Sequence, residues 1–543
     1  MTTQAIHRVA KNTGILYLRM AITVFISLYA TRLTLTALGV EDFGLYNLVG
    51  GVIAMLGFLN ASMASASQRF MSFAQGEGDL EKIKRIFNMS TLIHLGIAVA
   101  VVIIFEIVGY FFFNGLLNIE PARLPIAKMV YQFMVASTLF TIISVPYEAV
   151  ITSHENMLFF AITGIIESVL KLGIALYITY GSLSLPTEIS FIDDHLQITY
   201  SLFDNLVIYG LLMALLSILM LLAKRVYCHS KYTECEFSLI KHYDKPLLKQ
   251  MSGFAGWYLF VSASSMVANY GQGLVLNIFF GTTVNAAQGI ASQISGQLGV
   301  FSTTLLKALN PMIDKSEGAG DRRLMLKATM MGSKISFFLL MILYIPFLIE
   351  MPYLLGLWLK KVPEFTIIFC QLLLIRNLIE QLFIPVNLAI LAVGNIKSYQ
   401  IKSGLLFLLP LPITYILFKF GYPPYIIYLV FSVNSIMYAI LELYYAKKHC
   451  QLSITKFSSN VMLRCISVFI LVFLSSLLPH FLIDSNLMRL LGVLLTCSVS
   501  YVFLIYFLGF SFQERIEVNQ LCSQILNKIS LTRLFYTQQK SQL

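Results

Sequence analysis

Long apolar stretches alternate with short polar ones along almost the whole chain. Each apolar stretch has about 20 residues or more, the length that an α-helix needs to cross roughly 30 Å of hydrocarbon. Turn-like segments such as LGVEDFG and FGYPPY separate most of them. The pattern predicts about fourteen membrane-spanning helices, at residues 14–37, 44–73, 86–114, 126–152, 156–181, 203–223, 253–279, 285–313, 328–350, 364–393, 403–420, 424–445, 461–480 and 487–510.

The composition of the 543 residues supports this pattern. Hydrophobic residues make up 57% of the chain and charged residues only 12%, and the mean hydropathy is +0.78. A soluble globular protein has nearer 25% charged residues, so the fold class is an all-α polytopic membrane protein. The first stretch is too long for a signal-peptide core, so we expect a retained helix. The cysteines and histidines of residues 228–242 lack zinc-site spacing, and we expect neither a metal nor a cofactor.

The formal net charge of +11 is distributed unevenly among the connections. Numbered from the N-terminus, the even-numbered connections hold clusters of Lys and Arg at 82–85, 224–249 and 322–327, whereas the odd-numbered ones hold few. By the positive-inside rule, this asymmetry predicts that both termini lie in the cytoplasm. Because membrane topology accounts for the basic balance, we expect no nucleic-acid partner.

A repeated motif relates the two halves of the chain. Gly39, Gly78 and Asp79 each have an identical residue exactly 242 positions later, at Gly281, Gly320 and Asp321. Six predicted spans separate the equivalent positions. An even number keeps the orientation, so we expect two parallel six-helix repeats, related by a pseudo-two-fold axis along the membrane normal.

The repeat and the longest polar connection together predict the domain organisation. We expect a six-helix lobe at 1–223, an inter-lobe loop at 224–251, a second six-helix lobe at 252–446, two additional helices at 447–510 and a cytoplasmic tail at 511–543. The last two helices have no counterpart in the repeat. Two lobes of this kind are typical of alternating access at their interface.

Ionisable side chains inside the predicted spans point to functional positions, because a charge at bilayer depth needs a partner or an aqueous cavity. Glu167 and Lys171 lie one helical turn apart, as do Arg376 and Glu380, so each pair can neutralise itself on one helix face. The carboxylate of Glu167 is also a candidate coupling-ion site.

Five cations have no acidic residue three or four positions away: Arg19, Arg32, Arg69, Lys307 and Lys315. If they face one cleft between the lobes, they form an anion-binding site. The alternative for Arg69 and Lys315 is that they extend to the lipid headgroups. Arg32 lies about 20 Å along the helix from Arg19, so one anion cannot touch both.

Asn310 and Pro311 interrupt a predicted span, and the missing proline donor favours a kink that either lines a cavity or packs harmlessly. Glu106 and Glu148 are the candidates for a lone buried carboxylate that binds a coupling ion. The chain has no P-loop, HExxH or GxSxG motif, and no large outer connection that a membrane polymerase or ligase of sugars would need. We therefore expect a transporter and not an enzyme.

Three segments resemble the polysaccharide flippase branch of the multidrug/oligosaccharidyl-lipid/polysaccharide exporter superfamily. They are LGVEDFGLYNLV at 38–49, SASQRFMSFAQGEGDLEKIKRIF at 65–87 and ALNPMIDKSEGAGD at 308–321. Arg69 and Lys315 fall inside these motifs, whereas the other three cations are candidates on the charge argument alone.

The resemblance implies a flippase of the bacterial inner membrane. Its substrate would be an undecaprenyl-diphosphate-linked oligosaccharide, such as an O-antigen, capsule or exopolysaccharide repeat unit, moved to the outer leaflet through a central cationic cavity. Other polysaccharide-assembly membrane proteins are expected partners by resemblance only. The extra helices resemble those of lipid II flippases, where they border a groove for the lipid tail. The alternative within the same fold is a cation-coupled multidrug exporter.

Overall fold

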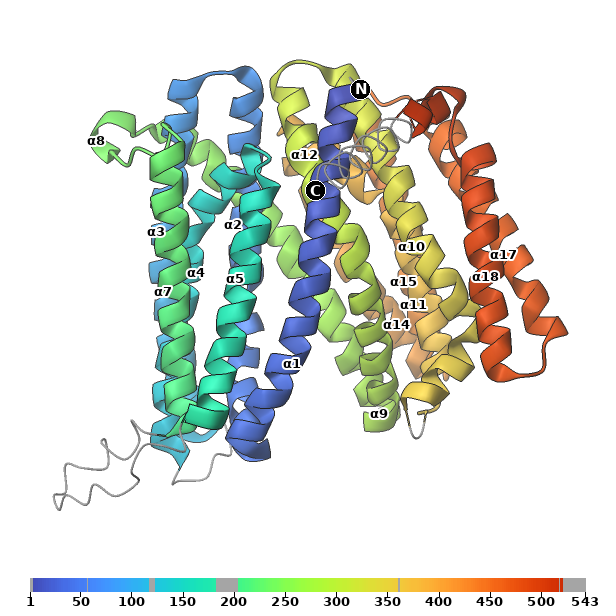
Figure 1. Cartoon of the computed structure of the whole chain (residues 1–543), viewed down its shortest axis with the longest axis horizontal. Coiled ribbons are helices and arrows are strands. Elements are labelled where there is room, and N and C mark those ends of the chain that lie inside the picture. Colours follow the sequence, from blue (N-terminus) through green and yellow to red (C-terminus); the bar gives the residue numbers. More distant parts are fainter. Residues whose placement is uncertain are drawn as a thin grey trace, which may run out of the picture.

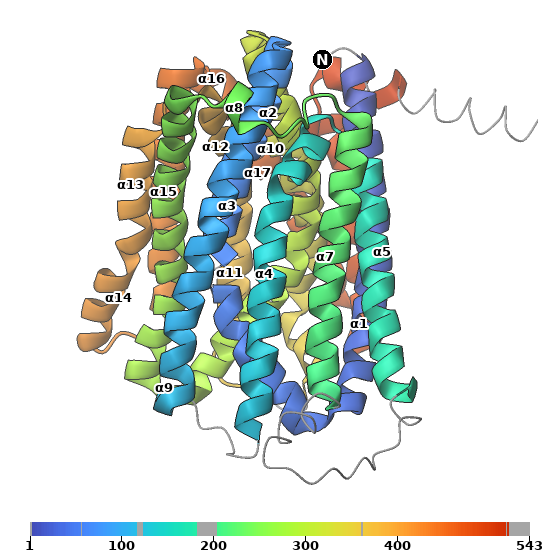
Figure 2. The same ribbon diagram turned by 90° about the vertical axis from the view of Figure 1, so that its left-hand side faces the viewer.

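The computed structural model describes residues 3–55, 57–116, 123–181, 204–359, 362–516 and 518–520, and within these ranges every regular element is a helix (Figure 1). The helices of the first half are α1 (Thr3–Met55), α2 (Gly57–Glu77), α3 (Leu80–Phe111), α4 (Leu124–Ser153), α5 (Met157–Leu176), α7 (Asn205–Lys231) and the short α8 (Leu239–His242). Figure 2 shows α3, α4, α5 and α7 running roughly parallel along the bundle.

The second half begins with the longest helix and ends with the two additional ones. Its helices are α9 (Lys245–Gly318), α10 (Arg322–Trp358), α11 (Thr366–Gln381), α12 (Ile384–Val393), α13 (Lys397–Leu408), α14 (Pro410–Lys419), α15 (Ile426–Cys450), α16 (Ile454–Phe457), α17 (Leu463–Leu482) and α18 (Asn486–Leu504). Short π-helical turns extend α3, α5 and α18 and precede α17, at Phe112–Leu116, Tyr177–Gly181, Ile505–Gly509 and Ser458–Met462. Residues 521–543, most of the predicted tail, lie outside the described residues.

The backbone repeats its conformation at the positions that the sequence pairs. Gly39 and Gly281 have φ angles of 75° and 76°, and Gly78 and Gly320 have φ angles of 77° and 73°. After the second pair, the Asp79 carboxylate accepts a hydrogen bond from the backbone N–H of Lys82, and Asp321 accepts the equivalent bond from Leu324. The predicted all-α class with two parallel repeats is confirmed.

Each half contains one long helix that is two helices joined at a single residue. In α1 this residue is Gly39, and in α9 it is Gly281. Glycine has no Cβ, so it adopts a positive φ without steric cost, and the chain turns there without a separate loop. We call the end of the bundle that carries Thr3, Glu77 and Gly318 the N-terminal end, and the end that carries Gly39 and Gly281 the opposite end (Figure 1).

Eleven helices in the described part of the chain are long and apolar enough to cross a membrane. The described residues of the predicted spans 44–73, 253–279 and 285–313 are also helical, but these spans are not among the eleven, so the count of fourteen stays a prediction. All three are rich in Ser, Asn, Gln and Gly, and they belong to α1, α2 and α9, which meet at the boundary between the halves. Polar helices are tolerated in a membrane where they face other helices or water.

The two additional helices and the segment that follows them are joined to α10 by ion pairs at two places. The Glu350 carboxylate accepts hydrogen bonds from Arg489 at 2.9, 3.1 and 3.0 Å and lies 2.8 Å from His480 Nδ1. Near the N-terminal end, Lys334 Nζ lies 2.5 Å from the Glu514 carboxylate. Glu350 and Lys334 are buried in α10. The additional helices therefore belong structurally to the second half, at the right-hand edge of Figure 1.

Candidate functional site

Two of the predicted cations, one from each half, converge on a single aromatic ring. Arg19 of α1 places its Cζ 4.5 Å from the centroid of the Phe160 ring in α5, and Lys307 of α9 places its Nζ 5.9 Å from the same centroid. A cation over an aromatic face is stabilised by the ring quadrupole. Beside the ring, Leu16 and Ala308 pack together and fix the spacing of the two helices. We call Arg19, Phe160 and Lys307 the cation site.

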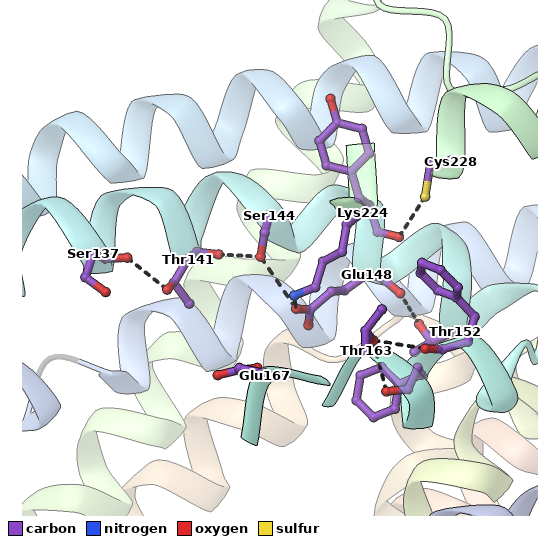
Figure 3. Close-up of polar contacts among 12 residues, drawn as sticks. Ser137, Thr141, Ser144, Glu148, Thr152, Thr163, Glu167, Lys224 and Cys228 are labelled. Carbon is purple, nitrogen blue, oxygen red and sulfur yellow. Dashed lines mark hydrogen bonds and ion pairs between the residues drawn. The ribbon is translucent and has the colours of Figure 1, made fainter. Parts of the chain in front are cut away.

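No carboxylate neutralises the cation site among the residues that the structure describes. Glu148 and Glu167 act on Arg19 electrostatically, but Glu148 forms an ion pair with Lys224, and Glu167 lies 2.7 Å from Lys171. Figure 3 shows Glu148, Lys224 and Glu167 together. The Glu167–Lys171 pair that the sequence predicts is thus confirmed. The site keeps two positive charges that the protein leaves uncompensated, which favours binding of an anion.

The surroundings of the site are closely packed at Arg19 and polar beside Lys307. Gly164 lies directly against the guanidinium of Arg19, and a side chain there would collide with it. Lys307 is exposed, and the exposed face of α9 continues at helical spacing through Thr303 and Val300 to Gln293. Exposed polar side chains on a membrane-spanning helix fit a water-filled space better than lipid.

A row of hydroxyl groups on α4 leads to this region. Thr141 donates to the Ser137 carbonyl at 2.9 Å, and Ser144 donates to the Thr141 carbonyl at 2.9 Å and to the Glu148 carboxylate at 3.5 Å (Figure 3). The row ends at the ion pair between Glu148 and Lys224. Glu148, predicted as a lone carboxylate, therefore has a cationic partner that the sequence analysis did not assign to it.

Arg69 and Lys315 lie at contacts between the halves and not at the cation site. Arg69 is 7% exposed and donates to the carbonyl of Ala392, at the C-terminus of α12, from Nε at 3.2 Å and from Nη2 at 2.6 Å. Lys315 Nζ lies 3.0 Å from the carboxylate of Glu155, to which Arg8 also donates at 3.5 Å. In each case a cation on the second span of one half contacts the turn between the fourth and fifth spans of the other half.

Between these two contacts, α2 and α9 touch backbone to backbone. A Cβ on Gly76 would collide with the Lys315 carbonyl, and a Cβ on Gly318 would collide with the Phe73 carbonyl. The two contacts are equivalent under the repeat, because Phe73 corresponds to Lys315 and Gly76 to Gly318. We call these two glycine contacts, together with the Arg69 and Lys315 contacts, the inter-lobe gate. The gate joins the two halves at the N-terminal end of the bundle.

The remaining candidates lie away from the cation site. Arg32 is exposed on α1, toward the opposite end. Glu106 is also exposed, and its carboxylate accepts a hydrogen bond from Gln132 at 3.3 Å. Asn310 and Pro311 lie within the helical part of α9, whose one non-helical residue is Gly281, so the break in this helix is at the glycine.

Two buried carboxylates that form no ion pair with any described residue were not identified from the sequence. Glu442 in α15 is 2% exposed, and its carboxylate accepts a hydrogen bond from the Tyr399 hydroxyl at 3.3 Å. Asp314 in α9 is 1% exposed, and its Oδ2 atom has no hydrogen-bond partner among the described residues. Glu106 and Glu148 stay the predicted candidates for a coupling-ion carboxylate in the cavity, and Glu442 and Asp314 are further buried carboxylates. Glu442 lies inside the predicted span 424–445 and could have been counted, whereas Asp314 lies one residue beyond the predicted span 285–313.

The second ion pair predicted within one helix is also present. The Arg376 guanidinium lies 2.8 Å from the Glu380 carboxylate, as the spacing predicts, and Ser435 donates to the same carboxylate at 2.6 Å. Within the described ranges, no group of three or more His, Cys, Asp or Glu side chains is arranged to hold a metal ion.

Comparison with known proteins identifies solved structures that have the same fold. No protein-family model and no curated protein sequence matches the chain. A crystal structure of a mutant MATE protein matches with a TM-score of 0.68 at 14% identity, and an outward-facing multidrug resistance MATE family transporter of the MOP superfamily matches with 0.65 at 13%. A MOP superfamily transporter from Pyrococcus furiosus, described as having a binding pocket of reversed polarity, also matches with 0.65 at 13%. Each alignment covers 83% of this chain and 96% of the other, so this chain has the fold of the MATE transporters of the MOP superfamily.

Proposed function

We propose that the protein is a flippase for a lipid-linked oligosaccharide diphosphate, and that the cation site binds the diphosphate. The observation that carries this proposal is the convergence of Arg19 and Lys307, from opposite halves, on the Phe160 ring without a described carboxylate partner. A planar guanidinium binds phosphate oxygens in a fork, and an ammonium adds a compact charge. A diphosphate supplies the negative charge that the site lacks.

The basic end of the bundle is proposed to face the cytoplasm of a bacterial inner membrane. The Lys and Arg clusters at 82–85, 224–249 and 322–327 all lie at the N-terminal end, which supports this orientation by the positive-inside rule. Both termini are then cytoplasmic. The substrate proposed from the motif resemblance is an undecaprenyl-diphosphate-linked repeat unit, whose isoprenoid tail stays in the lipid while its head passes between the lobes.

The inter-lobe gate supports an alternating-access mechanism. In this orientation the gate closes the cytoplasmic side, so uptake of the substrate head from that side requires the halves to separate there. Separation breaks the Arg69–Ala392 and Lys315–Glu155 contacts and parts Gly76 from Gly318. Binding a diphosphate between Arg19 and Lys307 favours the closed gate, because one ligand then bridges two halves.

A cation-coupled multidrug exporter is the second candidate function. Glu442 and Asp314 favour it, because both are buried carboxylates without a described ion-pair partner, and such groups bind protons or metal cations. An exporter of cationic compounds would need a negatively charged binding site, however, and Arg19 and Lys307 give the opposite charge. We therefore place the flippase first.

Reconstitution in liposomes tests the proposal. A fluorescent undecaprenyl-diphosphate-linked oligosaccharide is added, and the fraction that becomes accessible to an external reagent is measured over time. For Arg19→Ala with Lys307→Ala we expect the transport rate to fall by at least about a hundredfold, since charge-assisted hydrogen bonds contribute about 1.5–3 kcal/mol each. The matched control is Lys447→Ala with Lys448→Ala, which removes the same charge from exposed positions at the end of α15.

Three outcomes are distinguishable. Loss of transport in the site variant but not in the control supports the flippase and its site. Equal transport in both variants leaves a flippase with a different site. A wild-type protein that moves no lipid but extrudes a cationic dye replaces the flippase with the exporter.

A further inference from the structure

Two adjoining cavities open at the N-terminal end of the bundle, beside the inter-lobe gate. They lie between other helices than those that form the cation site. Their volumes are about 340 and 200 Å³. The cation site lies where α1 and α5 meet the second part of α9, whereas these cavities lie between α2, α3, the first part of α9 and the turn before α13. They share Phe70, Gln250, Gly394 and Asn395 as lining residues, so they form one continuous pocket, which we call the basic pocket.

Four cations line the basic pocket: Arg69, Lys82, Lys249 and Lys397. Lys82 is paired with Glu77 at 2.6 Å, and another nearby acid, Asp244, is paired with Arg85 at 3.2 Å. Lys249 and Lys397 are exposed and form no ion pair with any residue that the structure describes.

Arg69 has a donor to spare. Its Nε and Nη2 atoms donate to the Ala392 carbonyl, while Nη1 makes no hydrogen bond with a described residue. The residue is only 7% exposed, so this donor is held in a buried position. The pocket therefore has a net positive charge, and part of that charge is held rigidly.

The N-terminus of a helix adds to the positive electrostatic potential of the basic pocket. Helix α13 begins at Lys397 after Asn395 and Ile396, which also line the pocket. The residue before the helix, Ile396, has no side chain that can accept from the first N–H groups, so these groups lack the usual cap. Free N–H groups and the positive end of the helix dipole are a well-known binding arrangement for phosphate.

The apolar part of the pocket points to an amphiphile. Aromatic residues Phe70, Phe254 and Trp257 line it, and Lys397 Nζ lies 5.3 Å from the centre of the Trp257 ring. Farther along the same helix, Val267 and Leu274 are 54% and 64% exposed. Trp and Lys side chains together are typical of the level of lipid headgroups, with exposed aliphatic side chains beside the acyl chains.

We propose that the basic pocket binds the phosphate headgroup of an anionic phospholipid and so holds the inter-lobe gate closed. Arg69 and Lys82 belong to the first half, and Lys249 and Lys397 to the second, so one headgroup bridges both halves. This ligand is a resident lipid and not a transported substrate. The inference stands without the proposed function, because it uses none of the residues of the cation site.

Trp257 gives a direct reporter. The chain has only two tryptophans, and the other, Trp358, lies at the far end of α10. In Trp358→Phe, all tryptophan fluorescence therefore comes from the basic pocket. The full-length variant is reconstituted into phosphatidylcholine vesicles that contain a small fraction of either brominated phosphatidylglycerol or brominated phosphatidylcholine, and bromine quenching of Trp257 is measured.

We expect brominated phosphatidylglycerol to quench at a concentration about tenfold lower than brominated phosphatidylcholine does. Adding Lys249→Gln and Lys397→Gln should remove most of this preference, since each lysine near an anionic lipid contributes roughly a fivefold change in affinity. Adding Lys448→Gln and Lys456→Gln instead, two exposed lysines on α15 and α16, removes the same charge and should leave the preference intact.

Equal quenching by the two lipids overturns the proposal, as does an undiminished preference in the Lys249 and Lys397 variant. Inorganic phosphate at millimolar concentration is added as a further arm. If it displaces the brominated lipid completely, the pocket recognises a soluble phosphate and the lipid assignment fails. Because flipping is not the readout, failure here leaves the proposed function untouched, and failure of the flipping assay leaves this pocket untouched.

Discussion

The inter-lobe gate and the cation site both place cations between the two halves, but they treat the charge differently. At the gate, Arg69 binds the carbonyl of Ala392 and Lys315 binds the carboxylate of Glu155. At the cation site, Arg19 and Lys307 rest on an aromatic ring without a described ion-pair partner. A cation that donates to another part of the protein joins those parts, as Arg69 does through Nε and Nη2, whereas a cation without such a partner has all of its donors available to a ligand. The following variants test this difference.

The largest effect is expected where the backbones touch. In Gly76→Ala the new methyl group collides with the Lys315 carbonyl, and we expect the free energy of unfolding to fall by about 2 kcal/mol or more. Gly14→Ala is the matched control, because a Cβ there meets nothing within 4 Å. It should instead raise the stability by up to about 1 kcal/mol through helix propensity. Unfolding of the purified protein in detergent measures both, and a stabilising Gly76→Ala would contradict a closed gate.

The same substitution at two arginines separates the two roles. Arg69→Met leaves the buried Ala392 carbonyl without its donor and should cost about 2 kcal/mol of unfolding free energy. Arg19→Met strands no described partner and loses only its contact with Phe160, at a cost below about 1 kcal/mol. Flipping should nevertheless fail in Arg19→Met. Equal losses of stability in the two variants would show that the gate and the site do not differ as we describe.

A smaller effect is expected at the ion pair of the gate. Glu155→Gln weakens the bonds to Lys315 and Arg8, and we expect a loss of about 1 kcal/mol. A double-mutant cycle with Lys315→Met isolates the pair from other consequences of each change. Glu81→Gln is the control, because this exposed carboxylate forms an ion pair with Lys84 and with no other described residue. A coupling energy near zero would remove this pair from the gate.

The smallest effect concerns pH at the loop after α7. Burial alone would raise the pKa of Glu234, but hydrogen bonds to its carboxylate from His154 and Gln75 outweigh burial and hold the pKa below the ordinary value of 4.5. The folded state then binds fewer protons than the unfolded state as the pH falls below 4.5. The stabilising contribution is therefore complete above that pH and disappears below it. The wild type should exceed Glu234→Gln in unfolding free energy at pH 7, and the difference should shrink only as the pH falls below 4.5. A difference that stays constant below that pH would contradict this.

The sequence predicts those features that depend on residues close together in the chain. The hydrophobic pattern yields the helices, and the glycines 242 positions apart yield the repeat, because a left-handed turn needs a specific residue type at a specific place. The ion pairs of Glu167 with Lys171 and of Arg376 with Glu380 follow from one turn of a helix.

Features that join distant parts of the chain were beyond such reasoning. Arg69 and Ala392 are 323 positions apart, and Lys315 and Glu155 are 160 positions apart. The sequence shows that these cations lack a neighbour of opposite charge, but not that a remote turn supplies one. Arg19 and Lys307 could be named as cations at similar depth, whereas their meeting on Phe160 depends on how α1, α5 and α9 pack.

The fastening of α17 and α18 to α10 has a mechanical consequence. The ion pairs Lys334–Glu514 and Glu350–Arg489 make the additional helices and the segment after them a rigid extension of the second half, so that this half has a broader cross-section in the bilayer than the first. In a viscous medium, the body with the broader cross-section meets the greater drag. When the halves move against each other, we therefore expect the first half to turn farther relative to the surrounding lipid, while the second half acts as the anchored frame.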